Sequence, residues 1–171
     1  MSLELLKRRW PDVLAILILC ISGWIYYYQP GRMQDIAHPA PALTATQLDG
    51  QVFDPSSLKG RVVLVSFWAT WCGYCRKEMP DLEALQQKYG DKGLTVLALS
   101  VDDSPEKVQR FWKDNPYSFP VAMASTEVQK GFGGVEVLPT LFLVDEKGMI
   151  RKQVKGSVRA SALEAMVKEY L

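Results

Sequence analysis

Residues 67–76 read Phe-Trp-Ala-Thr-Trp-Cys-Gly-Tyr-Cys-Arg and follow directly on the apolar, β-branched run Val62-Val63-Leu64-Val65. That run predicts a buried strand over residues 61–68, and the apolar spacing after it predicts a helix over residues 73–89. Cys72 and Cys75 therefore stand where a strand turns into a helix. A helix N-terminus offers unpaired N–H groups and a positive dipole end, which favour the thiolate form of Cys72. Cys75 lies one helical turn further on, so the pair is predicted to be a dithiol poised for exchange.

The composition excludes several classes of protein. The chain has 171 residues, 48% of them hydrophobic, and a formal net charge of +1. This length suits one domain plus a short extra segment, and the near-neutral charge gives no reason to expect nucleic acid as a partner. Three cysteines and the single His38 are too few for a disulfide scaffold or a closed zinc site. We therefore predict no metal and no other cofactor.

An uncharged apolar run from Val13 to Tyr28 follows the basic cluster Lys7-Arg8-Arg9. Its length of about 16 residues is at the lower limit for crossing a bilayer, and Trp10 and Tyr26-Tyr27-Tyr28 stand where interfacial aromatic residues are found. By the positive-inside rule we expect residues 1–12 in the cytoplasm and residues 13–28 as a single anchor in the bacterial cytoplasmic (inner) membrane. The rest of the chain is then expected on the periplasmic, extracytoplasmic side.

A cleaved signal peptide is the alternative interpretation of this segment. A small-residue pattern does occur at Ala40-Pro41-Ala42, but it lies far beyond the apolar run and contains a proline. Cys20 lies inside the apolar run, where we interpret it as a small apolar residue of a membrane helix.

Residues 29–41 contain Pro30, Gly31, Pro39 and Pro41, which predicts an extended linker with His38 as a solvated side chain. From residue 42 onward the pattern predicts one domain, residues 42–171. Weak alternation on both sides of Asp49-Gly50 predicts a hairpin at its start. The strands and helices that follow predict an α/β fold with a mixed central sheet flanked by helices. We expect strands at 61–68, 94–101, 119–123, 140–144 and 149–154, and helices at 73–89, 105–115, 126–132 and from Ser161 onward.

The active-site stretch with the following Arg76-Lys77-Glu78-Met79-Pro80 resembles the thioredoxin superfamily, and specifically its membrane-anchored TlpA/ResA/DsbE-like branch. Three further segments carry the resemblance. Residues 57–64 resemble the lead-in to the active-site strand, and residues 94–103, ending Ser-Val-Asp-Asp, resemble the second strand. Val137-Leu138-Pro139-Thr140 resembles the loop that carries a cis-proline facing the dithiol. The resemblance spans residues 42–171 and implies a thioredoxin-like fold.

The resemblance also implies roles for single residues. Cys72 would attack a target disulfide, and Cys75 would resolve the mixed disulfide. Gly73 and Tyr74 would tune the reduction potential. The bend at Pro139 would present the backbone of Leu138 to an extended substrate.

Three further positions leave alternatives open. Trp71 is interpreted as a shield for the thiolate or as plain core packing. Glu78 is interpreted as an aid to proton transfer or as a solvated acid on the helix face. Ser66 departs from the thioredoxin pattern, because thioredoxins carry a buried aspartate there. A carboxylate base is therefore missing at that place.

The sequence thus predicts a membrane-anchored extracytoplasmic thiol–disulfide oxidoreductase that reduces protein disulfides. Its electrons would come from a membrane donor of the DsbD/CcdA type, as the resemblance implies. Targets consistent with the resemblance are the haem-site thiols of apocytochrome c during cytochrome c maturation, copper-site thiols and other secreted cysteines. A disulfide oxidase or isomerase on the same fold is the first alternative. A copper-binding metallochaperone is the second, and it is disfavoured because the only histidine falls in the predicted linker.

Overall fold

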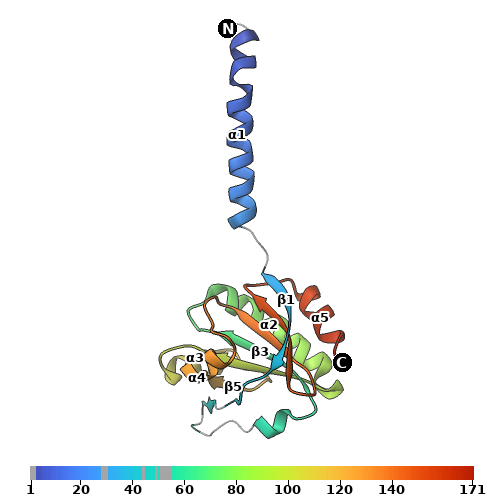
Figure 1. Ribbon diagram of the computed structural model, residues 1–171. Coiled ribbons are helices and arrows are strands. Elements are labelled where there is room, and N and C mark those ends of the chain that lie inside the picture. The colour runs from blue at the N-terminus through green and yellow to red at the C-terminus, as the bar shows by residue number, and fades with distance from the viewer. Residues whose placement is uncertain (1–2, 28–30, 44, 49, 51–54) are drawn as a thin grey trace. The chain divides into compact units, whose positions relative to one another are not determined.

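The computed structural model of the protein describes residues 3–27, 31–43, 45–48, 50 and 55–171 (Figure 1). The chain divides into two units, one ending at Pro30 and one beginning at Gly31. The first unit holds one helix, α1 (Leu3–Tyr27). Among the described residues, no helix has both the length and the hydropathy that a membrane span requires.

The second unit is built on a seven-stranded mixed sheet in the order β1-β7-β6-β3-β4-β5-β2. The central strands β3, β4 and β5 run parallel, and β6, β7, β1 and β2 pair with their neighbours antiparallel. The strands are β1 (Arg32–Pro39), β2 (Thr46–Gln47), β3 (Val62–Trp68), β4 (Leu94–Ser100), β5 (Val121–Met123), β6 (Thr140–Val144) and β7 (Met149–Lys155). The helices are α2 (Gly73–Tyr89), α3 (Pro105–Asp114), α4 (Thr126–Gly131) and α5 (Ala160–Lys168), with short 3-10 turns at Pro55–Leu58 and Gly90–Lys92.

Every side chain of β3 is buried, because helices cover both faces of the sheet (Figure 1). Leu64 and Trp68 face one core, which α2, α3 and α5 complete, and Trp68 packs against Phe111 at 5.1 Å between ring centroids. Val65 and Phe67 face the other core, on the side of α4, where Phe67 meets Phe132 edge-on at 5.2 Å. The alternation along β3 thus fixes the strand between two apolar layers, as the sequence predicts.

The prediction of a linker over residues 29–41 is wrong for its described part. Residues 32–39 form β1, which pairs antiparallel with β7 from Arg32 opposite Lys155 to Pro39 opposite Met149. Ile36 packs against the second core, and Gly31 lies so close to Gly156 that a Cβ at Gly31 would collide with the Gly156 carbonyl. Backbone pairing with the free edge of β7 holds this segment, and the domain begins at residue 31 rather than 42.

Two other predictions concern element boundaries. β2 pairs antiparallel with β5, and Asp49 and residues 51–54, where the rest of the predicted hairpin falls, lie outside the described residues. α5 begins at Ala160 after Arg159, so Ser161 lies in the first turn and does not cap the helix.

Candidate active site

Cys72 and Cys75 form a disulfide at the start of α2, with an S–S distance of 2.12 Å and a Cα–Cα distance of 5.3 Å. Cys72 is the N-cap residue of α2, and the backbone N–H of Cys75 donates to its Sγ at 3.2 Å. After reduction, the same N–H is available to a Cys72 thiolate at the positive end of the helix. Cys72 is 8% exposed and Cys75 is 1% exposed. Both cysteines are thus buried, and Cys72 is the more exposed of the two residues.

Trp71 and Tyr74 flank the disulfide as exposed aromatic side chains. Trp71 is 69% exposed and Tyr74 is 66% exposed. Core packing, one of the two interpretations of Trp71, is therefore wrong, because Trp68 fills the core at the end of β3. Gly73, the other residue between the cysteines, opens α2 and is exposed. Large apolar side chains left in solvent around a reactive group are typical of a surface that meets another protein.

The peptide bond between Leu138 and Pro139 is cis, which confirms the prediction made from the loop sequence. The pairing of Phe67 with Thr140 places this loop at the end of β3 from which the dithiol loop departs. Pro139 is buried and Leu138 is half-buried against both cores. No hydrogen bond joins the Leu138 backbone to another described residue, whereas the Pro139 carbonyl accepts from Gly156 at 2.8 Å. The Leu138 backbone is thus available to an extended partner strand.

Glu78 lies on the inner face of α2, one turn after Cys75, and is only 2% exposed. This burial excludes the interpretation as a solvated acid. Burial, together with the smaller effect of nearby Asp81, raises the pKa of Glu78 to about 8. The backbone N–H of Val158 opposes this shift, but neither carboxylate oxygen has a partner at ordinary hydrogen-bond distance among the described residues. A buried carboxyl with this pKa is protonated at neutral pH and can exchange its proton near that range.

Ser66 is buried in β3 on the side of α2, and its hydroxyl has no hydrogen-bond partner among the described residues. Ser66 is buried because β3 is a central strand of the sheet. Glu78 is therefore the buried carboxyl that α2 brings to this side of the sheet, since the strand position that holds an aspartate in thioredoxins is occupied by serine.

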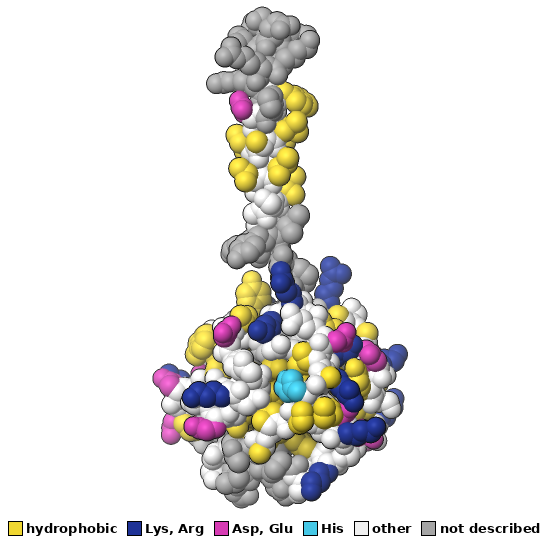
Figure 2. All heavy atoms as spheres, viewed as in Figure 1, with side chains coloured by type: hydrophobic (Ala, Val, Ile, Leu, Met, Phe, Trp, Pro, Cys, Tyr) yellow, Lys and Arg dark blue, Asp and Glu magenta, His cyan; other side chains and the backbone are white. Residues whose placement is uncertain are grey.

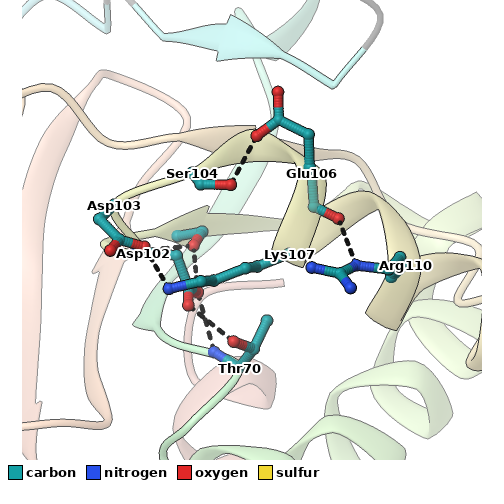
Figure 3. Close-up of polar contacts among 8 residues, drawn as sticks. Thr70, Asp102, Asp103, Ser104, Glu106, Lys107 and Arg110 are labelled. Carbon is teal, nitrogen blue, oxygen red and sulfur yellow. Dashed lines mark hydrogen bonds and ion pairs between the residues drawn. The ribbon is translucent and has the colours of Figure 1, made fainter.

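Sequence reasoning missed a carboxylate that holds the dithiol loop. Asp102, at the end of β4, accepts from the backbone N–H of Thr70 at 2.8 Å and from the Thr70 hydroxyl at 2.6 Å (Figure 3). The hydroxyl of Ser100 also donates to Asp102, at 2.8 Å. Thr70 lies two residues before Cys72, so this buried network fixes the turn between β3 and α2. The sequence Ser-Val-Asp-Asp after an apolar strand is the signal that could have indicated it.

Replacing Asp102 with alanine is expected to lower the free energy of unfolding by about 2–4 kcal/mol, because buried N–H and hydroxyl groups lose their acceptor. Urea unfolding of the purified protein measures this. Asp103→Ala is the matched control, since the Asp103 carboxylate is exposed and forms an ion pair with Lys107 instead of bonding to the dithiol loop (Figure 3). A similar loss in both variants would show that the network is not what stabilises the loop.

The side chains that could bind a metal ion do not cluster in the described residues. Among the described parts of the chain, no three His, Cys, Asp or Glu side chains gather as a metal site. His38 lies exposed on β1, and two strands, β7 and β6, stand between β1 and β3.

The sheet, the dithiol at the start of α2 and the cis-proline loop define a thioredoxin-like thiol–disulfide oxidoreductase. Residues 35–168 match the Redoxin family, and the chain belongs to that family. It is 35% identical to the thiol-disulfide oxidoreductase ResA of Bacillus thuringiensis over 162 residues, which cover 92% of this chain and 93% of the relative. It is 31% identical to the thioredoxin-like protein YneN of Bacillus subtilis over 94% of this chain and 96% of that one.

Solved structures agree on the fold. A thiol:disulfide interchange protein of the thioredoxin family from Chlorobium tepidum has a TM-score of 0.72 and 30% identity, over 80% of this chain and 98% of its own. StoA from Bacillus subtilis has a TM-score of 0.61 and 26% identity, over 73% of this chain and 98% of its own. The identification of the superfamily from residues 67–80 is confirmed.

Proposed function

We propose that this oxidoreductase is anchored in the bacterial cytoplasmic membrane and reduces disulfides of proteins on the extracytoplasmic side. The observation that carries the exchange chemistry is the asymmetry of the dithiol. Cys72 is the more exposed cysteine and caps the helix N-terminus, and Cys75 is the more enclosed one. Attack by Cys72 forms a mixed disulfide, and attack by Cys75 releases the reduced target and leaves the Cys72–Cys75 bond.

The apolar surface of α1 supports the anchor. Large hydrophobic side chains from Val13 to Ile21 are exposed along the helix, and Cys20 is exposed among them (Figure 2). A helix that is hydrophobic on all sides is stable when it is buried in protein or in lipid. The basic residues that precede it favour a cytoplasmic N-terminus by the positive-inside rule, and on that orientation we propose that the oxidoreductase domain lies on the other side of the membrane.

Glu78 and Leu138 have proposed roles in the exchange. The ionised form of Glu78 accepts the proton that Cys75 loses when it attacks the mixed disulfide. Its pKa of about 8 keeps that form accessible near neutral pH and lies close to the range in which a thiol ionises. The free backbone of Leu138 pairs with the target segment that carries the disulfide. Both roles rest on groups that have no other partner at ordinary distance among the described residues.

The proposed electron flow runs from a membrane donor of the DsbD/CcdA type, through Cys72 and Cys75, to protein targets. An extracytoplasmic compartment oxidises thiols, so a reductase there needs such a donor to return it to the dithiol state. The proposed targets are proteins whose cysteines must be free to take up another group, such as apocytochrome c or copper-site proteins.

One experiment tests on which side of the membrane the oxidoreductase domain lies and whether the protein reduces or oxidises its targets. Spheroplasts that express the Cys20→Ser chain are treated with a large maleimide that does not cross membranes. We expect Cys72, the more exposed cysteine, to be labelled in intact spheroplasts with an active donor. When the donor is deleted, Cys72 should be unlabelled and joined to Cys75 in the disulfide. Labelling only after lysis would contradict the extracytoplasmic side. A stable Cys72–Cys75 disulfide with the donor intact would favour the oxidase over the reductase.

A further inference from the structure

A hollow of about 430 Å³ lies beside the dithiol, between the start of α2 and the end of α3. We call it the basic hollow. Its lining begins at Gly73, the residue after Cys72, and is completed by Arg76, Lys77, Pro80, Phe111, Asn115 and Tyr117. The residues come from the helix that carries the cysteines and from the segment that packs against Trp68. A molecule bonded to Cys72 therefore has this hollow next to it.

The charge of the basic hollow has one sign. Arg76 and Lys77 are the two charged residues in its lining, and neither has a carboxylate partner within ion-pair distance among the described residues. Other cations of the described surface, such as Lys168, also lack a carboxylate at ion-pair distance, but Arg76 and Lys77 line one hollow beside the dithiol. The Glu83 carboxylate acts on Tyr117 of the lining as well, but it accepts from the Ser118 N–H and forms no ion pair with either cation. Two positive charges without an ion-pair partner at one concave site favour an anionic group there.

Aromatic rings position the two cations. The Arg76 guanidinium lies 5.8 Å from the centroid of Phe111, and the Lys77 ammonium lies 5.8 Å from that of Tyr74. These contacts direct both long side chains without consuming their hydrogen-bond donors. The guanidinium fork of Arg76 can hold a carboxylate with two parallel hydrogen bonds. The aromatic rings give an apolar surface to the carbon stem of the acidic side chain that carries this carboxylate.

We infer that the basic hollow binds an acidic side chain, aspartate or glutamate, of the protein target next to the cysteine that Cys72 attacks. This inference rests on the proposed attack by Cys72. The mixed disulfide fixes the target cysteine at Cys72, and an extended chain advances by about 3.3 Å per residue. The acidic residue therefore lies within about one to three residues of the target cysteine. The preferred substrates are disulfides flanked by acidic residues, and disulfides flanked by basic residues are disfavoured.

Peptides with one cysteine, activated as a mixed disulfide with 2-thiopyridine, test this inference. The Cys72 thiolate attacks the peptide sulfur, the bond to the pyridyl sulfur breaks, and the leaving thiolate takes a proton from solvent as coloured pyridine-2-thione. The leaving group is neutral and does not compete for the hollow. The full chain in detergent carries Cys20→Ser and Cys75→Ser, so that Cys72 is its only thiol. Because the assay measures attack alone, its result does not depend on the net redox direction.

The measured quantity is the ratio of second-order rate constants for peptides with aspartate or with lysine on both sides of the cysteine. We expect a ratio of about 10 in favour of aspartate, as two partly exposed charge pairs would give, and a smaller ratio at high salt. Arg76→Glu with Lys77→Glu should bring the ratio to one or below. Any change in the nucleophilicity of Cys72 affects both peptides alike and cancels in the ratio.

Lys168→Glu is the matched control, since it reverses an exposed charge on α5 outside the hollow, and the ratio should stay unchanged. Equal rates for both peptides, or a ratio that the double reversal leaves unchanged, would overturn the inference and leave the proposed function standing. No release of pyridine-2-thione from any peptide would overturn the role of Cys72, and both proposals with it.

Discussion

Replacing Cys72 with serine should abolish disulfide reduction, with a loss of at least about a thousandfold in rate against a protein disulfide with dithiothreitol as electron source. Cys75→Ser should behave differently. It keeps the attacking sulfur at the helix N-terminus but cannot resolve the mixed disulfide, so target proteins should accumulate as covalent adducts that reductant releases. Non-reducing electrophoresis of the purified variants with a disulfide substrate measures both outcomes.

Cys20→Ser is the control for this pair, because the Cys20 thiol lies on α1, in the unit that ends at Pro30, and takes no part in the exchange. Its activity should equal that of the natural chain. Adducts formed by Cys72→Ser but not by Cys75→Ser would reverse the assignment of the two sulfurs. The accessible position of Cys72 and the enclosed position of Cys75 argue against that outcome.

Replacing Glu78 with glutamine should make the protein more stable at alkaline pH. The pKa of Glu78 is raised from 4.5 to about 8 on folding, so between these values the folded chain holds a proton that the unfolded chain has lost. Unfolding releases that proton, and rising pH therefore favours the unfolded chain. The loss of folding stability that Glu78 causes is absent below pH 4.5, grows between pH 4.5 and about pH 8, and is complete above about pH 8. A shift of this size corresponds to at most about 5 kcal/mol.

Urea unfolding between pH 5 and pH 9 measures this difference. The natural chain should lose stability across the window relative to Glu78→Gln, and the two curves should meet near pH 5. Glu83→Gln, on the same helix, is the matched control, because an amide oxygen at this place can still accept from Ser118. Parallel curves for Glu78→Gln and the natural chain would show that Glu78 does not titrate in this range. Slower resolution of mixed disulfides by Glu78→Gln would add support for its role in proton transfer.

The active-site helix could be predicted from the sequence because local signals mark both of its ends. Cys72 caps it at the start, and the glycine-rich segment 90–93 follows its end at Tyr89. The apolar run of β3 is equally local, since both faces of that strand are buried. The side of α2 on which Glu78 lies could also have been found. Glu78 stands three residues after Cys75 and four before Leu82, and both neighbours face the core.

One missed residue, Asp102, and one wrong prediction, the linker over residues 29–41, both concern contacts between distant parts of the chain. Asp102 meets Thr70 across 32 residues of sequence, and a carboxylate after a strand looks like an ordinary loop residue until its partner is known. β1 mixes polar and apolar residues irregularly along Arg32–Pro39, so it shows neither strict alternation nor an apolar run. Its backbone, not its side chains, joins it to β7, and side-chain patterns do not report that kind of pairing.

The position of β1 also affects how the sheet meets its surroundings. β1 covers the outer edge of β7, whose N–H and C=O groups would otherwise face solvent along most of the strand. Open edges of this kind join to other chains and begin aggregates. The exposed charged and polar side chains of β1, such as Asp35, in turn make it a poor template for a further strand. A shortened chain that starts at Ala42 would expose the β7 edge, whereas one that starts at Gly31 keeps the sheet closed on that side.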